Sequence, residues 1–142
     1  MAVSIPPPPA PAPGRPGVLL FDPDQPWREA LAGALRERGL APAPAATLEE
    51  ARWRLHERRP DLLILSTAPG NLALESLLAV LNRRGAPPPV LLIEDRRGGG
   101  CPETWRFLRA ARTLRRPCRV RDVADAASDL LRRAGAERQA GA

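Results

Sequence analysis

Two types of side chain are missing from this chain of 142 residues, which contains neither lysine nor tyrosine. All 22 basic residues are therefore arginines. Without lysine, the chain cannot form a Schiff base or supply the lysine of a P-loop, so enzymes of these two kinds are excluded. Cys101, Cys118 and His56 have no metal-ligand spacing and cannot complete a tetrahedral zinc site without carboxylates. The sequence therefore predicts no metal site and no cofactor.

Long apolar runs are also missing, since no segment approaches the roughly 18 apolar residues that a membrane span needs. The N-terminal segment MAVSIPPPPAPAPG has no basic region followed by an apolar one, as a secretory signal would have. Two cysteines in a chain without such a signal indicate reduced thiols. We therefore expect a cytoplasmic protein that does not interact with membranes.

Proline divides the chain into regions. The first 17 residues hold seven of the 18 prolines, which is typical of a disordered or polyproline-II tail. Residues 18–134 have the alternating apolar and polar segments of one folded domain, and 135–142 are predicted to form a second disordered tail. A domain of this size can bury roughly two thirds of its unfolded surface, which is enough for one hydrophobic core.

Short apolar runs alternate with amphipathic segments along the folded region. The predicted strands cover 18–21, 40–46, 62–65, 90–93 and 118–121. The predicted helices start after Asp24, which is a candidate N-cap, and at the capping box of Thr47 and Glu50, and the others cover 71–84, 103–115 and 123–134. Continuous apolar strands are typical of a parallel sheet with helices on both faces. We therefore predict a flavodoxin-like three-layer α/β fold with a five-stranded parallel sheet and five helices, in which 40–46 is an edge strand because it contains two prolines.

Three segments carry a resemblance to a known family: GVLLFDPDQPWREALAGALRERGL, TLEEARWRLHERRPDLLILSTAPG and PPPVLLIEDRRG. In length, order and strand-end positions they resemble the CheY-like receiver domain of bacterial two-component response regulators. The resemblance covers residues 17–134. Active receivers hold Mg²⁺ with an acidic pair after the first strand and accept a phosphoryl group on an Asp that ends the third. A Thr or Ser ends the fourth strand, and a Lys ends the fifth.

Of these positions, only Asp22 carries the residue type found in active receivers. The resemblance places the acidic pair on Asp22 and Pro23, with Asp24 next in the chain. The remaining positions fall on Ser66 for the acceptor, Glu94 for the Thr or Ser, and Arg121 for the Lys, with Arg119 as the alternative. A serine hydroxyl without a neighbouring base is a poor nucleophile, and Mg²⁺ prefers carboxylate ligands that Pro23 and Ser66 do not supply.

These replacements predict a pseudo-receiver, which is a receiver fold without phosphotransfer. We hypothesise that Arg121 forms an ion pair with Asp22, with Glu94 or with both, in place of the metal. The alternative is that the three charges are solvated separately. The expected function is that of a stand-alone, phosphorylation-independent module that binds another protein in bacterial signalling.

The C-terminal third carries the excess positive charge, with nine arginines and four acidic residues from 103 to 133. Part of this charge is predicted to form one stripe on a helix, with a further arginine nearby, and the candidate partner-binding residues are Arg106, Arg109, Arg112, Arg116 and Arg119. A protein with an acidic surface is the expected partner. Like charges favour a monomer or a weak dimer. A solvated basic face and a nucleic-acid-binding surface are the alternatives, although aromatic residues for base stacking are few.

Catalysis is not expected. Neither a nucleophile elbow of the form Gly-x-Ser-x-Gly nor a dinucleotide-binding Gly-x-Gly-x-x-Gly follows a predicted strand. His56 lies within a predicted helix and is interpreted as a surface residue rather than as a catalytic base.

Overall fold

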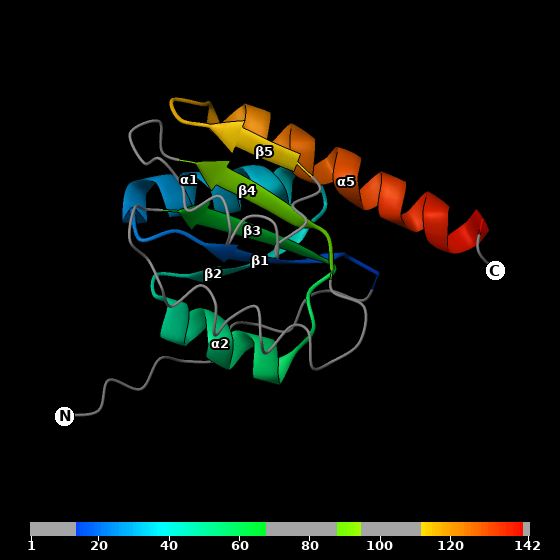
Figure 1. Ribbon diagram of the computed structural model, residues 1–142, viewed down its shortest axis with the longest axis horizontal. Helices are drawn as coiled ribbons and strands as arrows, with labels where there is room; N and C mark the ends of the chain where they lie inside the picture. The colour runs from blue at the N-terminus through cyan, green and yellow to red at the C-terminus, as the bar shows by residue number, and fades with distance from the viewer. Residues whose placement is uncertain (1–13, 68–87, 95–111, 141–142) are drawn as a thin grey trace, which may run out of the picture.

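Five parallel strands form a single sheet in the computed structural model, which describes residues 14–67, 88–94 and 112–140. The strand order is β2-β1-β3-β4-β5 (Figure 1). The bounds are Gly17–Phe21 for β1, Ala41–Ala45 for β2, Leu62–Thr67 for β3, Val90–Glu94 for β4 and Arg112–Arg115 for β5. All four neighbouring pairs run parallel, so the predicted five-stranded parallel sheet is confirmed.

Helices cover both faces of this sheet. They are α1 (Gln25–Glu37), α2 (Leu48–Glu57) and α5 (Val120–Ala140). Figure 1 shows α1 and α5 on one face and α2 on the other, which gives the three layers that the sequence predicts. The described residues contain these three helices. The predicted helix over 71–84 and most of the one over 103–115 lie outside the described residues.

Side chains of the central strands alternate between two hydrophobic cores. Val18 and Leu20 of β1 pack on the side of α1 and α5, whereas Leu19 and Phe21 pack on the side of α2. Successive side chains of a strand point to opposite faces, so a strand covered on both faces must be apolar throughout. Burial of each large aliphatic side chain contributes roughly 1.5–3 kcal/mol, and this burial holds the ends of the strands in register.

The edge strand β2 has the sequence APAPA, and its register explains why the two prolines are tolerated. The Ala41 N–H donates to the Pro16 carbonyl at 2.8 Å, and the Ala45 carbonyl accepts from the Asp22 N–H at 3.1 Å. The alanines therefore face β1, and the alternation places Pro42 and Pro44 toward the outside of the sheet. Because proline has no N–H, only this placement avoids the loss of a bond between the strands.

Both predicted helix starts are observed. The Asp24 side chain accepts a hydrogen bond from the Trp27 N–H at 3.5 Å, and Thr47 Oγ1 accepts one from the Glu50 N–H at 3.1 Å. The Glu50 carboxylate reaches back to the N–H of Ala46, one residue before the cap. These caps fix the first turns of α1 and α2, which follow the short loops after β1 and β2.

The last strand lies earlier in the chain than predicted. β5 covers Arg112–Arg115 rather than 118–121, and the last four residues of the predicted helix over 103–115 are therefore strand. Val120 begins α5 and continues its buried face, which includes Val123, Ala124, Ala127 and Leu131. Because Val120 fits this helical spacing, it belongs to α5 and not to a strand. α5 also continues to Ala140, so most of the segment predicted as a C-terminal tail is helical.

None of the helices in the described part of the chain is long and apolar enough to cross a membrane.

Candidate functional site

Asp22 and Ser66 meet at the carboxyl ends of two neighbouring strands. Asp22 directly follows β1 and is completely buried, and Ser66 near the end of β3 is 7% exposed. The Ser66 hydroxyl donates to Asp22 Oδ2 at 2.8 Å. The Asp24 N–H donates to Asp22 Oδ1 at 2.9 Å. Both carboxylate oxygens therefore have a hydrogen-bond donor within the protein.

Arg116 supplies the positive charge that this buried carboxylate needs. It directly follows β5, and its N–H extends the sheet ladder by donating to the Glu94 carbonyl at 2.8 Å. Its Nη2 lies 2.5 Å from Asp22 Oδ2 and 3.2 Å from Ser66 Oγ. The guanidinium carbon also lies 5.3 Å from the centre of the Trp27 ring on α1, which is within the range of a cation–π interaction.

The three polar groups form a closed cluster, which we call the Asp22 cluster (Asp22, Ser66 and Arg116). An isolated buried carboxylate is strongly disfavoured, and a hydrogen-bonded guanidinium removes most of that penalty. Nearby, burial raises the pKa of the Cys118 thiol, while the positive charge of Arg116 partly opposes that rise. The charge of Arg116 therefore acts on the Cys118 thiol as well as on the Asp22 carboxylate.

Glu94 ends β4 and is held by a different arginine. Its Oε2 lies 3.6 Å from Nε of Arg115, which is the last residue of β5. The Arg115 side chain is 82% exposed, so this ion pair is weak. The carboxylate of Glu94 lies at the same end of the sheet as Asp22, because the carboxyl ends of parallel strands lie together.

The residues of the Asp22 cluster do not fit a Mg²⁺ ion. The neighbouring Pro23 has no side-chain ligand atom, and the exposed Asp24 side chain caps α1. Asp22 Oδ2, the oxygen nearest Ser66, already carries a guanidinium. Mg²⁺ requires hard oxygen ligands in octahedral geometry and is repelled by a cation at the same oxygen. Among the described residues, no group of three or more His, Cys, Asp or Glu side chains is arranged to hold a metal ion.

The solved structures most similar to this chain include several receiver domains. A receiver domain of the putative LuxO repressor protein from Vibrio parahaemolyticus is 18% identical with a TM-score of 0.73, covering 90% of this chain and 98% of that one. The fold of this chain is that of a response regulator receiver domain.

Two further structures agree with this fold. A CheY-like receiver domain protein from Methanospirillum hungatei is 18% identical with a TM-score of 0.72 and covers 87% of this chain and 99% of that one. An orphan response regulator of H. pylori is 17% identical with a TM-score of 0.67 and covers 83% of this chain and 98% of that one. No family model and no curated protein matches the sequence.

In this receiver fold, the basic residue after the fifth strand is Arg116, and the prediction of Arg121 is wrong. Arg121 lies in the first turn of α5 and is exposed, and the alternative, Arg119, is exposed just before α5. The error follows from the misplaced strand. Two features of the sequence indicate the correct position of the strand. Pro117 has no N–H for a sheet and so ends the strand before it, and the helical spacing that begins at Val120 excludes a strand over 118–121.

The predicted arginine stripe is also corrected. Arg112 lies on β5 and Arg116 points into the Asp22 cluster, so these two do not share a helix face. Arg106 and Arg109 lie outside the described residues. The exposed arginines that the structure does place around β5 and the start of α5 form a set that we call the basic edge: Arg112, Arg115, Arg119 and Arg121.

Proposed function

We propose that this chain is a pseudo-receiver that binds another protein in bacterial signal transduction and does so without accepting a phosphoryl group. The observation that carries this proposal is the Asp22 cluster, in which the guanidinium of Arg116 and the hydroxyl of Ser66 both bind Asp22 Oδ2. An internal ion pair takes the place that the resemblance assigns to a metal and a phosphoacceptor.

The chemistry of Ser66 supports the absence of phosphotransfer. Its hydroxyl points at a carboxylate, which in another setting would act as a general base. Here the same oxygen already forms an ion pair with a guanidinium, so it is engaged and poorly placed to act as a general base. Glu94 adds a negative charge at the same end of the sheet, where it repels an incoming phosphoryl group.

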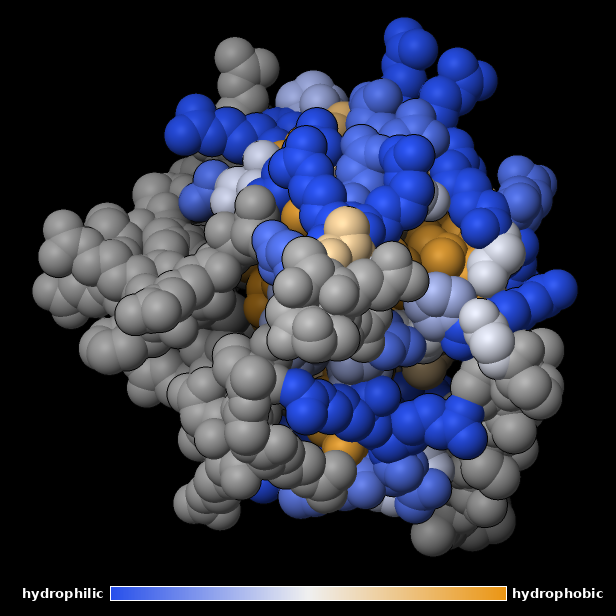
Figure 2. Space-filling view, turned by 90° about the vertical axis from the view of Figure 1, so that its right-hand side faces the viewer, coloured by the Kyte–Doolittle hydropathy of each residue, from blue (hydrophilic) through white to orange (hydrophobic). Residues whose placement is uncertain are grey.

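The basic edge supports an acidic protein as the partner. Arg115 has only a long contact to Glu94, and within the described residues no ion pair joins Arg112, Arg119 or Arg121 to a carboxylate. Figure 2 shows mostly hydrophilic side chains on the described surface of the side it views, with small hydrophobic areas between them. Trp53 on α2 is the large hydrophobic side chain that is exposed in the described part. Nucleic acid is less favoured, because bases stack on aromatic rings and no described ring is exposed beside the basic edge.

The phosphorylation claim is tested by intact-mass spectrometry after incubation with acetyl phosphate and Mg²⁺. The wild type should show no phosphoryl adduct. A variant with the family residues restored, Pro23→Asp/Ser66→Asp/Glu94→Thr/Arg116→Lys, serves as the positive control. A phosphoryl adduct on Ser66 or Asp22 of the wild type would refute the proposal.

The interaction claim is tested by affinity capture from nuclease-treated bacterial extract, followed by rebinding of each captured protein in purified form. We expect the charge reversal Arg112→Glu/Arg115→Glu/Arg119→Glu to remove the partner. The matched control, Arg52→Glu/Arg58→Glu/Arg59→Glu, reverses three exposed charges in or just after α2, and it should retain the partner. Loss in both variants, or capture of nucleic acid alone when nuclease is omitted, would contradict a protein-binding basic edge.

A further inference from the structure

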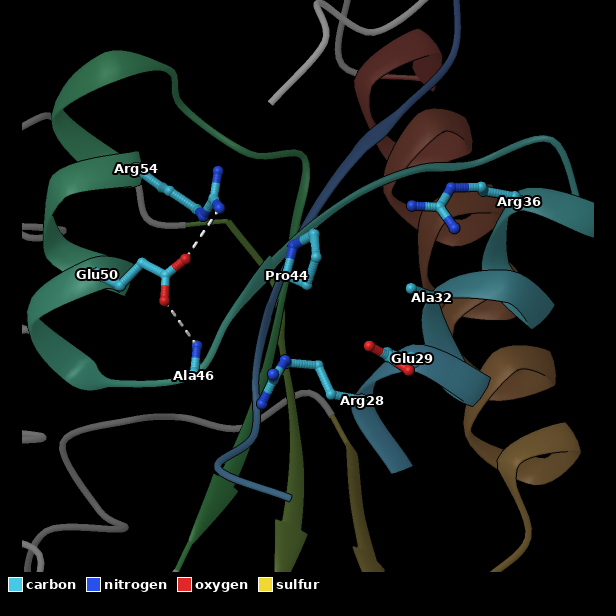
Figure 3. Close-up of a pocket in the computed structure, with 8 residues that line it drawn as sticks. All are labelled: Arg28, Glu29, Ala32, Arg36, Pro44, Ala46, Glu50 and Arg54. Carbon is cyan, nitrogen blue, oxygen red and sulfur yellow. Dashed lines mark hydrogen bonds and ion pairs between the residues drawn. The ribbon is translucent and has the colours of Figure 1, made fainter. Parts of the chain in front are cut away.

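A second group of charged side chains lies at the opposite edge of the sheet, beside β2. A pocket of about 270 Å³ opens there between α1, which covers one face of the sheet, and α2, which covers the other. Figure 3 shows Glu50 and Arg54 entering from α2, with Arg28, Glu29 and Arg36 on α1 across from them. Pro44 of β2 lies between the two sides. We call this the β2-edge pocket.

Arg54 is the unusual residue of this pocket. Its side chain is only 9% exposed, yet among the described residues a single ion pair holds it, from Nη2 to Glu50 Oε1 at 2.9 Å. Its Nε and Nη1 are buried and have no hydrogen-bond partner in the described part of the chain. A buried donor without an acceptor is costly, and more so when it belongs to a charged group. A guanidinium in this position therefore lacks a partner that carries further acceptor oxygens.

Glu50 cannot fill that role alone. One of its carboxylate oxygens accepts from Arg54 Nη2, and the other accepts from the Ala46 N–H at 3.0 Å, as the dashed lines of Figure 3 show. Both oxygens are therefore engaged, and the geometry of the capping box fixes the carboxylate in place. The missing acceptors must come from outside this pair.

The remaining charges around the pocket favour an anion. Arg28, Arg36 and Arg54 face Glu29 and Glu50, which leaves an excess of one positive charge. Arg28 is anchored by a bond of 2.8 Å from Nη1 to the Asp22 carbonyl. Arg36 is exposed in the last turn of α1 and lines the pocket. Glu29 is exposed and accepts from Gln25 at 3.1 Å.

The wall between the charges is apolar and cannot bind an added strand. Pro44 and Ala32 line the pocket, and proline has no N–H with which to pair with a neighbouring strand. Strand addition at this edge is therefore disfavoured, whereas the apolar proline ring offers a surface for a small organic group. The pocket, at about 270 Å³, is slightly smaller than the usual small-molecule site of roughly 300–1,000 Å³, so it suits a small ligand.

We propose that the β2-edge pocket binds a small organic phosphate, with the phosphoryl oxygens on Arg54 and Arg36 and the organic part against Pro44 and Ala32. A phosphate carries several acceptor oxygens and matches the fork of a guanidinium. Because Nε and Nη1 of Arg54 are shielded from water, binding requires the guanidinium to turn toward the pocket that it lines. The site is separate from the basic edge, so it adds a chemical input to the proposed interaction module.

The proposal is tested by isothermal titration of the full chain with adenosine monophosphate, pyrophosphate, inorganic phosphate and uncharged adenosine. Adenosine monophosphate should bind, inorganic phosphate should bind more weakly, and adenosine should not bind. Arg54→Gln should abolish binding, and Arg36→Gln should weaken it roughly tenfold, because each removes a charged donor. Arg52→Gln, an exposed arginine of α2 that does not line the pocket, should bind like the wild type.

Three results would overturn the proposal. They are the failure of every phosphate to bind, an equal loss in Arg52→Gln, and binding that survives both Arg54→Gln and Arg36→Gln. Inorganic phosphate binding as tightly as adenosine monophosphate would refute a role for the organic part. Should Arg54→Gln fail to fold, as judged by circular dichroism, the exposed Arg36→Gln decides the question. These outcomes do not depend on the basic edge, so they are independent of the proposed function.

Discussion

Arg116 and Arg54 each hold a carboxylate, at opposite edges of one sheet, and their surroundings differ. The guanidinium of Arg116 meets a fully buried aspartate, a serine hydroxyl and the ring of Trp27. The guanidinium of Arg54 meets one glutamate oxygen, and two of its buried nitrogens have no acceptor among the described residues. The first arginine is partly exposed and neutralises a buried carboxylate whose two oxygens both have donors, whereas the second is buried with two nitrogens that lack an acceptor among the described residues.

This difference predicts a structural role for Arg116 and a binding role for Arg54. Arg116 supplies the counter-charge of a fully buried carboxylate, so removing it should cost stability. A cation that lacks acceptors is prepared for a ligand, and removing it should cost binding more than stability. Substituting each arginine separately should therefore affect mainly stability at Arg116 and mainly ligand binding at Arg54.

The largest expected effect is on stability, from Arg116→Ala. This change leaves the buried Asp22 carboxylate without its counter-charge, and we expect a loss of about 3 kcal/mol in the free energy of unfolding. Urea denaturation measures it. The neighbouring Arg115→Ala removes only a long and exposed contact to Glu94 and should cost less than about 0.5 kcal/mol. Equal losses in the two variants would mean that the Asp22 cluster has no special role in stability.

At the β2 edge, the double variant Arg54→Met/Glu50→Gln should behave differently. It removes the unsatisfied guanidinium nitrogens and the charge of their partner, while a glutamine oxygen can still accept from the Ala46 N–H. We expect the unfolding free energy to stay within about 1 kcal/mol of the wild type, because replacing a buried ion pair with neutral groups is often tolerated. A loss as large as that of Arg116→Ala, in the same urea experiment, would erase the contrast between the two arginines.

A smaller loss than that of Arg116→Ala is expected from Arg116→Lys. Lysine keeps the positive charge but offers a point charge in place of a planar group that can bind Asp22 and Ser66 while lying near the Trp27 ring. We expect a loss of about 1 kcal/mol, measured by thermal and urea unfolding. A variant as unstable as Arg116→Ala would show that the planar geometry, rather than the charge, holds the cluster together.

The smallest effect concerns Cys118. Burial raises the pKa of this thiol, so less thiolate is present at mildly alkaline pH than in the unfolded chain, and alkylation should be slower. Since the folded protein favours the protonated thiol, stability is fully present below the ordinary thiol pKa and declines slightly as the pH rises above it. Iodoacetamide rates in a Cys101→Ser background measure this reactivity. Arg116→Ala should slow the reaction further, because its charge opposes the rise, and a faster reaction would contradict that assignment.

Much of the fold follows from local sequence patterns. The apolar runs predict the central strands, the prolines predict the edge position of β2, and Asp24 and Thr47 predict two helix starts. These signals work because strands buried on both faces must be apolar and because helix ends need caps. They fail at β5, where the arginine-rich segment has no apolar run to mark a strand.

The site was predictable only where it depends on strand ends. Asp22 and Ser66 could be placed together because β1 and β3 are marked by their apolar residues. Arg116 could not, since its position depends on the weakly marked β5, and the sequence pattern favours Arg121 in its place. The β2-edge pocket has no signal in the sequence at all, because its two walls come from helices on opposite faces of the sheet, and only the fold brings them together.

The edges of the sheet have a consequence for the protein at high concentration. Bare edge strands recruit other chains and can start aggregation. β2 presents Pro42 and Pro44, which cannot donate to an approaching strand, and β5 carries Arg112 and Arg115, whose charges repel a second copy. Prolines therefore protect one edge and arginines protect the other. We expect this chain to remain dispersed at concentrations at which an unprotected sheet would form fibres.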